Sequence, residues 1–315
     1  MKFRFLQHCK NCISRLGRSE EGNVALLVAA SVVVLCGFSA LVSDLGVLYA
    51  ERQHIADSAD AGALAGADDL LKGASVAADT AYQYAAQNDP GATFKTVADS
   101  DKKTVTVTGE RTLQLWFARV LGTSHATVHN QSTAALGTLV AATGMVPIAV
   151  PQQEFQYGQE VYLSDGAGED TSGNFGYLDF SGNGANGVEQ DIEQGYDFPL
   201  HVGELVSTET GDMAGPVQTA IQYRLDEDTG DSGCDSYDTA KADCPRVMYL
   251  PIVNTLDVSG KKDVTIVGFA SFYLEGLDNT GGHARIIGRF IRMIRSGTIG
   301  SGQDFGTYSV KLTHS

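Results

Sequence analysis

The sequence predicts a single-pass membrane protein. An N-terminal transmembrane helix continues into an amphipathic helix, and a small α+β module and a mainly β C-terminal domain follow. Three observations predict this class: an uncharged run near the N-terminus, a Pro-free and Ala-rich stretch after it, and a later change to strand-like runs separated by Gly-, Asp- and Asn-rich turns. The expected divisions are a basic tail at 1–23, an anchor at 24–47, a helical and α+β module at 48–144, and a β-rich domain at 145–315.

The distribution of charge favours a membrane crossing. The chain has 22 Lys and Arg against 38 Asp and Glu, which gives a formal net charge of −16. Residues 1–23 nevertheless carry a net charge of +3, whereas residues 151–315 carry −15. Contacts with nucleic-acid phosphates need a basic face, so a chain this acidic is not expected to bind nucleic acid.

The run from Gly22 to Ser43 contains no charged residue. As a helix it would be about 33 Å long at roughly 1.5 Å per residue, which matches a hydrocarbon core of about 30 Å. Because short basic flanks stay in the cytoplasm, the N-terminus is predicted inside and the C-terminal domain outside. A cleaved secretory signal is the alternative, although its apolar region is usually about 7–15 residues and no A-x-A site follows this run. A buried helix of a soluble protein and a prepilin-type processing site fit less well.

Residues 44–73 continue as a helix that presents a stripe of small residues. Apolar or small positions recur with helical spacing at Leu48, Ile55, Ala59, Ala63 and Leu70. Rows of small residues let another backbone approach closely. The row predicts either packing on the chain's own domain, which is favoured, or docking of a partner helix. The predicted helix-packing residues are Ala59, Gly62, Ala63 and Gly66.

The rest of the module predicts alternating helix and strand. A helix at 74–87 ends at Asn88-Asp89-Pro90-Gly91. A strand is expected at 104–108 and another at 126–136. Between them lies a compact apolar segment, 113–121, which Gly122 ends like a helix C-cap.

The second domain is predicted to be mainly β, with two short helices at 188–194 and 217–225. The run at 264–274 is almost continuously apolar, as expected of a strand that is covered on both faces. The expected strands are 160–163, 177–180, 247–253, 264–274 and 284–294.

The five cysteines predict one disulfide. Cys9 and Cys12 form a lone C-x-x-C in a tail too short to supply further ligands, and Cys36 lies in the apolar run. Cys234 and Cys244 are the only cysteines outside the membrane on this topology, in a compartment where disulfides persist. Their pairing closes a short loop and is expected to stabilise the fold by roughly 2–3 kcal/mol.

Other motifs are weak signals of chemistry. Acidic residues flank the disulfide loop and could hold calcium, but the EF-hand pattern is absent, which favours a solvated loop. Residues 182–187 match G-x-G-x-x-G within a β-rich context, which favours a flexible turn. His125 and His129 lack a third ligand for zinc. We therefore predict no catalytic, cofactor-binding or metal residues and no small-molecule substrate.

Four arginines form a basic stripe along the strand expected at 284–294. The stripe could meet an acidic partner or lipid headgroups. The favoured interpretation is that the arginines pair with the domain's own carboxylates. The residues are Arg285, Arg289, Arg292 and Arg295.

The segment 18–67 resembles the N-terminal region of TadG-like proteins, in the TadE/TadG-like group of Flp (Tad) pilus assembly components. The matching residues are Glu21-Gly22, Asp44-Leu45-Gly46, Tyr49, Arg52 and the small-residue row at 59–67, and the segments Trp116–Gly122 and Thr127–Ala135 also resemble this group. The second domain resembles associated C-terminal regions more loosely, at Gly173–Phe180, His201–Glu204, Val267–Ala270 and Ile286–Ile291. Many TadG proteins carry a von Willebrand A domain, whose D-x-S-x-S motif is absent here, so metal-dependent adhesion is not carried over.

The resemblance implies a non-enzymatic component of a Tad-type pilus assembly or secretion apparatus, without a cofactor. The protein would be anchored in the cytoplasmic membrane of a bacterium, and its partners would be other Tad pilus or pseudopilin components. Its helix would dock pilin-like helices through the Gly62 and Gly66 row. Two alternatives remain: an anchored cell-surface binding or adhesive module, and an envelope hydrolase, for which no motif marks a nucleophile and base.

Overall fold

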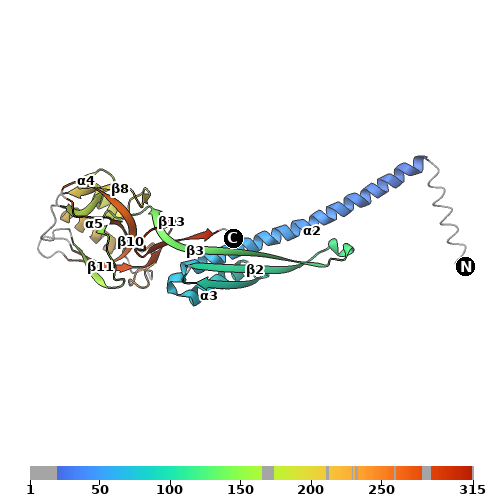
Figure 1. The fold of residues 1–315 in the computed structure, drawn as a ribbon, viewed down its shortest axis with the longest axis horizontal. Coiled ribbons are helices and arrows are strands. Elements are labelled where there is room, and N and C mark those ends of the chain that lie inside the picture. The colour runs from blue at the N-terminus through green and yellow to red at the C-terminus, as the bar shows by residue number, and fades with distance from the viewer. Residues whose placement is uncertain are drawn as a thin grey trace.

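A single helix runs through the predicted anchor and the predicted amphipathic stretch. The computed structural model describes residues 20–101, 103–164, 174–210, 213–228, 230, 233–258, 260–278 and 285–313. Helix α2 spans Glu20–Asp68, 49 residues without a break. Its N-terminal half projects alone from the rest of the molecule (Figure 1). Within the described part of the chain, α2 is the one helix long and apolar enough to cross a membrane.

The C-terminal half of α2 packs with a second helix against a sheet whose strands pair antiparallel, except for the parallel pair β12 and β14. After a short 3-10 turn, η1 (Leu70–Lys72), helix α3 runs over Ala74–Asn88. The sheet has the order β1-β2-β3-β14-β12, and β7 and β13 pair with β3. Strands β2 and β3 form a long hairpin whose turn contains the 3-10 turn η2 (Ala118–Leu121). The strand bounds are β1 Thr93–Asp99, β2 Thr104–Gln114, β3 His125–Ala142, β7 Leu200–His201, β12 Met293–Ile294, β13 Thr298–Gly300 and β14 Thr307–Thr313.

A second sheet forms the head of the molecule, at the opposite end from the free half of α2 (Figure 1). Its order is β4-β9-β10-β11-β5, and β8 links β10 to β6. All seven residues of β9 are buried, because the strand is covered on both faces. The bounds are β4 Val150–Pro151, β5 Glu160–Ser164, β6 Asn174–Asp179, β8 Leu205–Thr210, β9 Val247–Val253, β10 Asp263–Asp278, β11 Arg285–Ile291, α4 Gly184–Gln194 and α5 Ala214–Glu227.

The coarse fold prediction is confirmed: one long apolar N-terminal helix that could span a membrane precedes a mostly β region. The predicted strand at 264–274 is the buried centre of β10. Two local expectations need correction. The segment 113–121 is the end of β2 followed by a 3-10 turn, although Gly122 does cap that turn in the left-handed conformation, with φ 95°. Residues 184–187 form the first turn of α4 rather than a flexible turn.

The two sheets share the C-terminal part of the chain. After β11, the chain leaves the head and returns to the first sheet, where β14 pairs with β3 along six residue pairs. Strand β7, from the middle of the predicted second domain, also pairs with β3. The last strand therefore completes the sheet that the predicted 48–144 module begins, and a cut at residue 144 would remove it.

Candidate functional site

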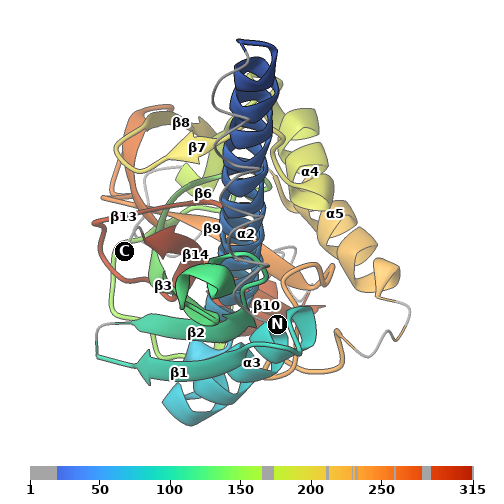
Figure 2. The ribbon, with the colours of Figure 1, turned by 90° about the vertical axis from the view of Figure 1, so that its right-hand side faces the viewer.

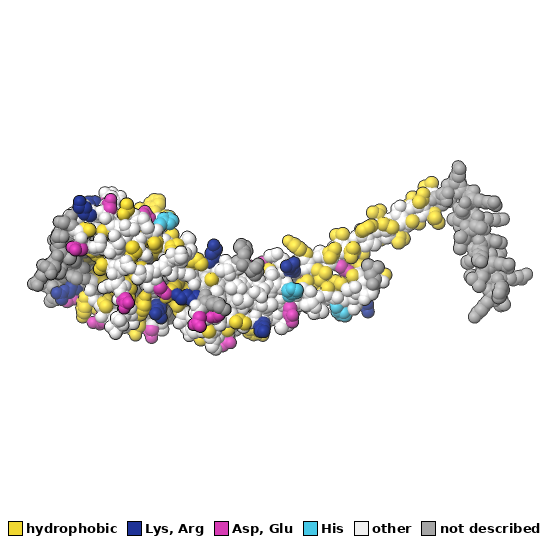
Figure 3. Space-filling model, in the orientation of Figure 1, with side chains coloured by type: hydrophobic (Ala, Val, Ile, Leu, Met, Phe, Trp, Pro, Cys, Tyr) yellow, Lys and Arg dark blue, Asp and Glu magenta, His cyan; other side chains and the backbone are white. Residues whose placement is uncertain are grey.

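The free half of α2 is an apolar surface without protein neighbours. Its most apolar stretch has no residue buried in the structure, and side chains such as Val33 (71%), Leu35 (65%) and Phe38 (64%) are largely exposed. Figure 3 shows hydrophobic side chains along this whole projection. Inside this run the hydroxyls of Ser39 and Ser43 donate to the carbonyl oxygens one turn earlier, both at 2.9 Å. These two hydroxyls thus find acceptors within the helix itself, as a lipid environment requires.

The small-residue row of α2 lies inside the chain's own fold. Ala59 and Ala63 have no exposed surface, and α3 packs directly over the row. A Cβ built on Gly62 would lie 2.6 Å from the carbonyl oxygen of Ala81, and one on Gly66 would lie 2.7 Å from that of Ala77. Only glycine permits so close an approach of the two helices. This agrees with packing on the chain's own domain, and the row offers no open surface to a partner helix in this structure.

Asp44 clips the tip of the β2–β3 hairpin to α2. Its side chain is 4% exposed and accepts hydrogen bonds from three consecutive backbone N–H groups: those of Trp116 at 3.1 Å, Phe117 at 3.0 Å and Ala118 at 2.7 Å. Hydrogen bonds from N–H groups to an ionised carboxylate are charge-assisted. Each is roughly twice as strong as a hydrogen bond between neutral groups. Because Asp44 directly follows the uncharged run, the clip fixes the hairpin tip where that run ends.

Two turns further along α2, an ion-pair cluster ties the helices to the sheet. Arg111 of β2 donates from Nη1 to Glu51 of α2 and from Nη2 to Asp89, which caps the end of α3. The three side chains are 19%, 26% and 10% exposed, so the charges are largely shielded from water. Asp89 also accepts the N–H of Gly91 at 3.2 Å, which holds the turn after α3. The guanidinium of Arg111 thus joins β2 to α2 and to the end of α3.

The sequence did not reveal either contact. Asp44 and Arg111 are single charged residues, and their partners lie 72–74 and 22–60 positions away. The available signal for Asp44 was its place immediately after 22 uncharged residues.

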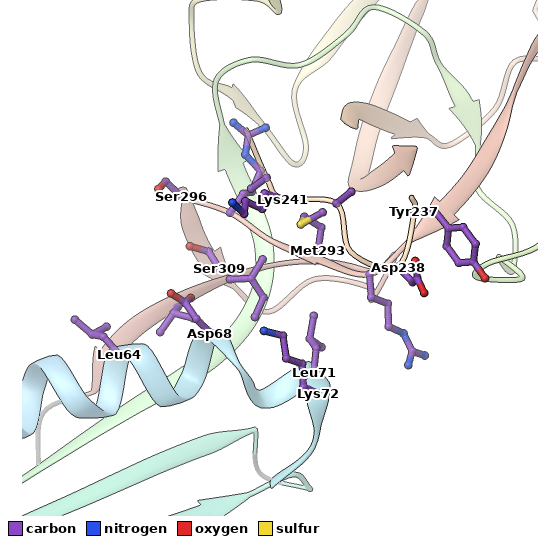
Figure 4. A pocket seen from close by; sticks show the side chains of 16 residues that line it. Leu64, Asp68, Leu71, Lys72, Tyr237, Asp238, Lys241, Met293, Ser296 and Ser309 are labelled. Carbon is purple, nitrogen blue, oxygen red and sulfur yellow. The ribbon is translucent and has the colours of Figure 1, made fainter. Parts of the chain in front are cut away.

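A cavity of about 850 Å³ lies between the first sheet's helices and the head. Figure 4 shows Asp68 at the end of α2 and Lys72 in η1, opposite Lys241 of the disulfide loop and Met293 of β12. Burial, reinforced by the charge of Asp69, raises the pKa of Asp68. The described side chains that line the cavity include neither His nor Cys. The cavity thus marks the junction between the α2 end and the head, and its lining mixes both signs of charge.

The predicted cysteine pair is joined in the structure. Cys234 and Cys244 form a disulfide with their Cα atoms 5.4 Å apart, and both are buried. Tyr273 donates its hydroxyl to the carbonyl oxygen of Cys234 at 2.6 Å, which attaches the loop to β10. Cys9 and Cys12, the lone C-x-x-C for which no site was predicted, lie outside the described residues.

The remaining sequence candidates do not converge on a site. Among the described residues no group of three or more His, Cys, Asp or Glu could hold a metal ion. In the acidic loop Asp228 pairs with Arg246, and Asp231 lies outside the described residues. His125 and His129 are both exposed on β3.

The arginine stripe pairs partly with carboxylates and partly with aromatic rings. Arg289 donates to Glu275 at 2.7 Å, whereas Arg292 and Arg295 lie over tyrosine rings at 4.7 and 3.8 Å from the centroids. The expectation of carboxylate partners is therefore met by Arg289. Cation–π contacts hold Arg292 and Arg295, and Arg285 is exposed.

These features describe an apolar helix that could cross a membrane and that leads out of a β-rich body. Hydrogen bonds to Asp44 join the two where the uncharged run ends. Residues 22–69 match the family model described as putative Flp pilus-assembly TadE/G-like. The matched segment coincides with nearly all of α2. Comparisons with curated proteins and with solved structures found no match. The family match indicates a role in pilus assembly and association with a membrane.

Proposed function

We propose that the chain is a membrane-anchored, non-enzymatic component of a Tad/Flp-type pilus assembly or secretion apparatus that docks pilin-like helices. The observation that carries this proposal is the family match over residues 22–69 on a helix whose apolar half stands free of the body. A lipid bilayer is the medium in which such a surface is stable, because burying it in water-free surroundings removes the cost of hydrating apolar side chains.

The expected location is the cytoplasmic membrane of a bacterium, with the N-terminus in the cytoplasm and the body outside. The basic tail supports this orientation, because Lys and Arg near a span are retained in the cytoplasm. The buried disulfide between Cys234 and Cys244 supports it independently, since such bonds persist in oxidising compartments.

We assign the docking of pilin-like helices to the free half of α2. The row at Gly62 and Gly66 is occupied by α3, so a partner helix has no access to it. The exposed side chains between Val24 and Val42 have no protein neighbour and lie at the depth where other membrane helices would run. Association there would rest on van der Waals packing between helices rather than on a hydrophobic driving force.

A helix exchange separates docking from anchoring. Cells lacking the gene are complemented with the full chain or with a variant in which residues 24–42 are all Leu, which keeps an apolar span of equal length. We expect the full chain to restore pili and the poly-Leu variant to insert but restore few. Normal piliation with the poly-Leu variant would reduce α2 to an anchor. Normal piliation without any copy of the gene, with loss of surface attachment, would favour the adhesive alternative.

A further inference from the structure

The tip of the β2–β3 hairpin exposes large apolar side chains. Trp116 is 79% exposed, Phe117 50% and Val120 87%, and all three belong to the turn that contains η2. Arg119, between them, is exposed as well. Burying apolar side chains is favourable in proportion to the surface removed from water, so a turn that leaves these side chains in water gives up that stabilisation.

The hairpin tip is held beside the end of the uncharged run. Asp44 is the residue directly after Ser43, where that run ends. Its three hydrogen bonds hold the backbone of the hairpin tip, at residues 116–118, beside this position of α2. Figures 1 and 2 both show the hairpin reaching back along α2 to place its turn against the helix. The tip therefore lies at the level where α2 would leave the hydrocarbon region.

The exposed apolar surface continues from the span onto this level of α2. Leu45 is 56% exposed, Val47 48% and Tyr49 74%, although these residues follow Asp44, the first charged residue after the uncharged run. Trp and Tyr are the residues that concentrate at membrane–water interfaces, because their rings are apolar at one end and polar at the other. An arginine next to them can extend its guanidinium toward lipid phosphates.

We propose that the hairpin tip is a second membrane contact, in which Trp116, Phe117 and Val120 enter the headgroup region of the leaflet through which α2 emerges. The occupant of this surface is the lipid bilayer, because the surface is continuous with the span itself. A single helix can tilt and rotate in a membrane, whereas a helix and a hairpin tip fixed to each other define one orientation. The contact would hold the body at a constant angle to the membrane. This inference rests on the anchoring part of the proposed function.

Trp116 is the only tryptophan of the chain, so selectively excited tryptophan fluorescence reports on the hairpin tip alone. The full chain is reconstituted in phosphatidylcholine vesicles, and its emission is quenched either by aqueous iodide or by lipids brominated close to the headgroup or close to the acyl-chain end. We expect strong quenching by the headgroup-proximal bromines, weaker quenching by the deep bromines, and protection from iodide. A matched control carries Trp116→Phe together with Phe198→Trp, because Phe198 is 66% exposed on the head. That control should be quenched by iodide and not by either bromolipid.

The outcomes separate the contact from the anchor. If the chain stays with the vesicles after carbonate extraction but Trp116 is quenched by iodide as strongly as the Phe198→Trp control, anchoring stands and the hairpin contact is refuted. That result would make a protein partner the better occupant of the tip. If carbonate extracts the chain, anchoring and the hairpin contact both fail. In a variant with Val120→Asp, we expect quenching by the headgroup-proximal bromines to fall at least twofold while the chain remains inserted.

Discussion

Substituting Gly66 by Ala tests the close packing of α2 on α3. The added Cβ would lie 2.7 Å from the carbonyl oxygen of Ala77, 2.7 Å from the Cβ of Ala81 and 3.0 Å from a methyl group of Val105. Ordinary contacts begin near 3.4 Å, so α3 must move away by several tenths of an ångström or the side chain must remain strained. Overpacking of this kind costs about 1–3 kcal/mol.

Gly46→Ala is the matched control. Gly46 lies on the same helix and has nothing within 4 Å of a built Cβ. Both substitutions gain up to about 1 kcal/mol of helix propensity, so the difference between the two variants isolates the overpacking. We expect Gly66→Ala to be less stable than Gly46→Ala by about 1–3 kcal/mol.

Thermal unfolding of the detergent-solubilised full chain, followed by circular dichroism, measures this difference. A change of 1 kcal/mol shifts the Tm of a body of this size by roughly 2–4 °C, so the two variants should differ by several degrees. Equal Tm values for both variants would show that α3 does not cover Gly66, and the row would again be open to a partner helix.

Three further predictions concern the body. Replacing Arg111 by Ala leaves two shielded carboxylates without a cation and should lower the free energy of unfolding by about 3 kcal/mol. Urea denaturation measures this loss, and an unchanged midpoint would contradict the stabilising role of the ion-pair cluster. Replacing Cys234 and Cys244 by Ser should cost about 3 kcal/mol, and adding a reductant to that variant should change nothing more. Burial, with two neighbouring carboxylates, raises the pKa of Asp191 to about 6, so the folded state binds the extra proton and stability should fall as pH rises from about 4 to 6. Asp191→Asn should therefore raise stability at pH 7 by at most about 3 kcal/mol and flatten this pH dependence, whereas a destabilised variant would contradict the burial argument.

The sequence predicted the elements whose cause is local. The uncharged run predicted the long apolar helix that forms the free half of α2, because hydropathy and length are local properties of the sequence. The helix stop at Asn88-Asp89-Pro90-Gly91 predicted the end of α3 within one residue. The apolar run at 264–274 predicted a strand buried on both faces, and it forms the centre of β10.

Long-range contacts could not be predicted in the same way. A small-residue row has the same spacing whether its partner is α3 or another protein, so the sequence left both interpretations open. The return of β14 to β3 joins residues about 170–180 positions apart, and strand pairing at that separation leaves no local pattern. The Asp44 clip uses backbone N–H groups, which every non-proline residue carries, so no residue type marks the partner.

Photocrosslinking in piliated cells tests whether the free half of α2 docks pilin-like helices. A photoreactive residue replaces Val33, which is 71% exposed on the free half of α2, and Phe198 on the head serves as the control position. We predict an adduct between the Val33 position and a pilin-like subunit, absent from cells that lack the pilin genes and absent from the Phe198 position. An adduct only with lipid at Val33, in cells that assemble normal pili, would contradict the claim.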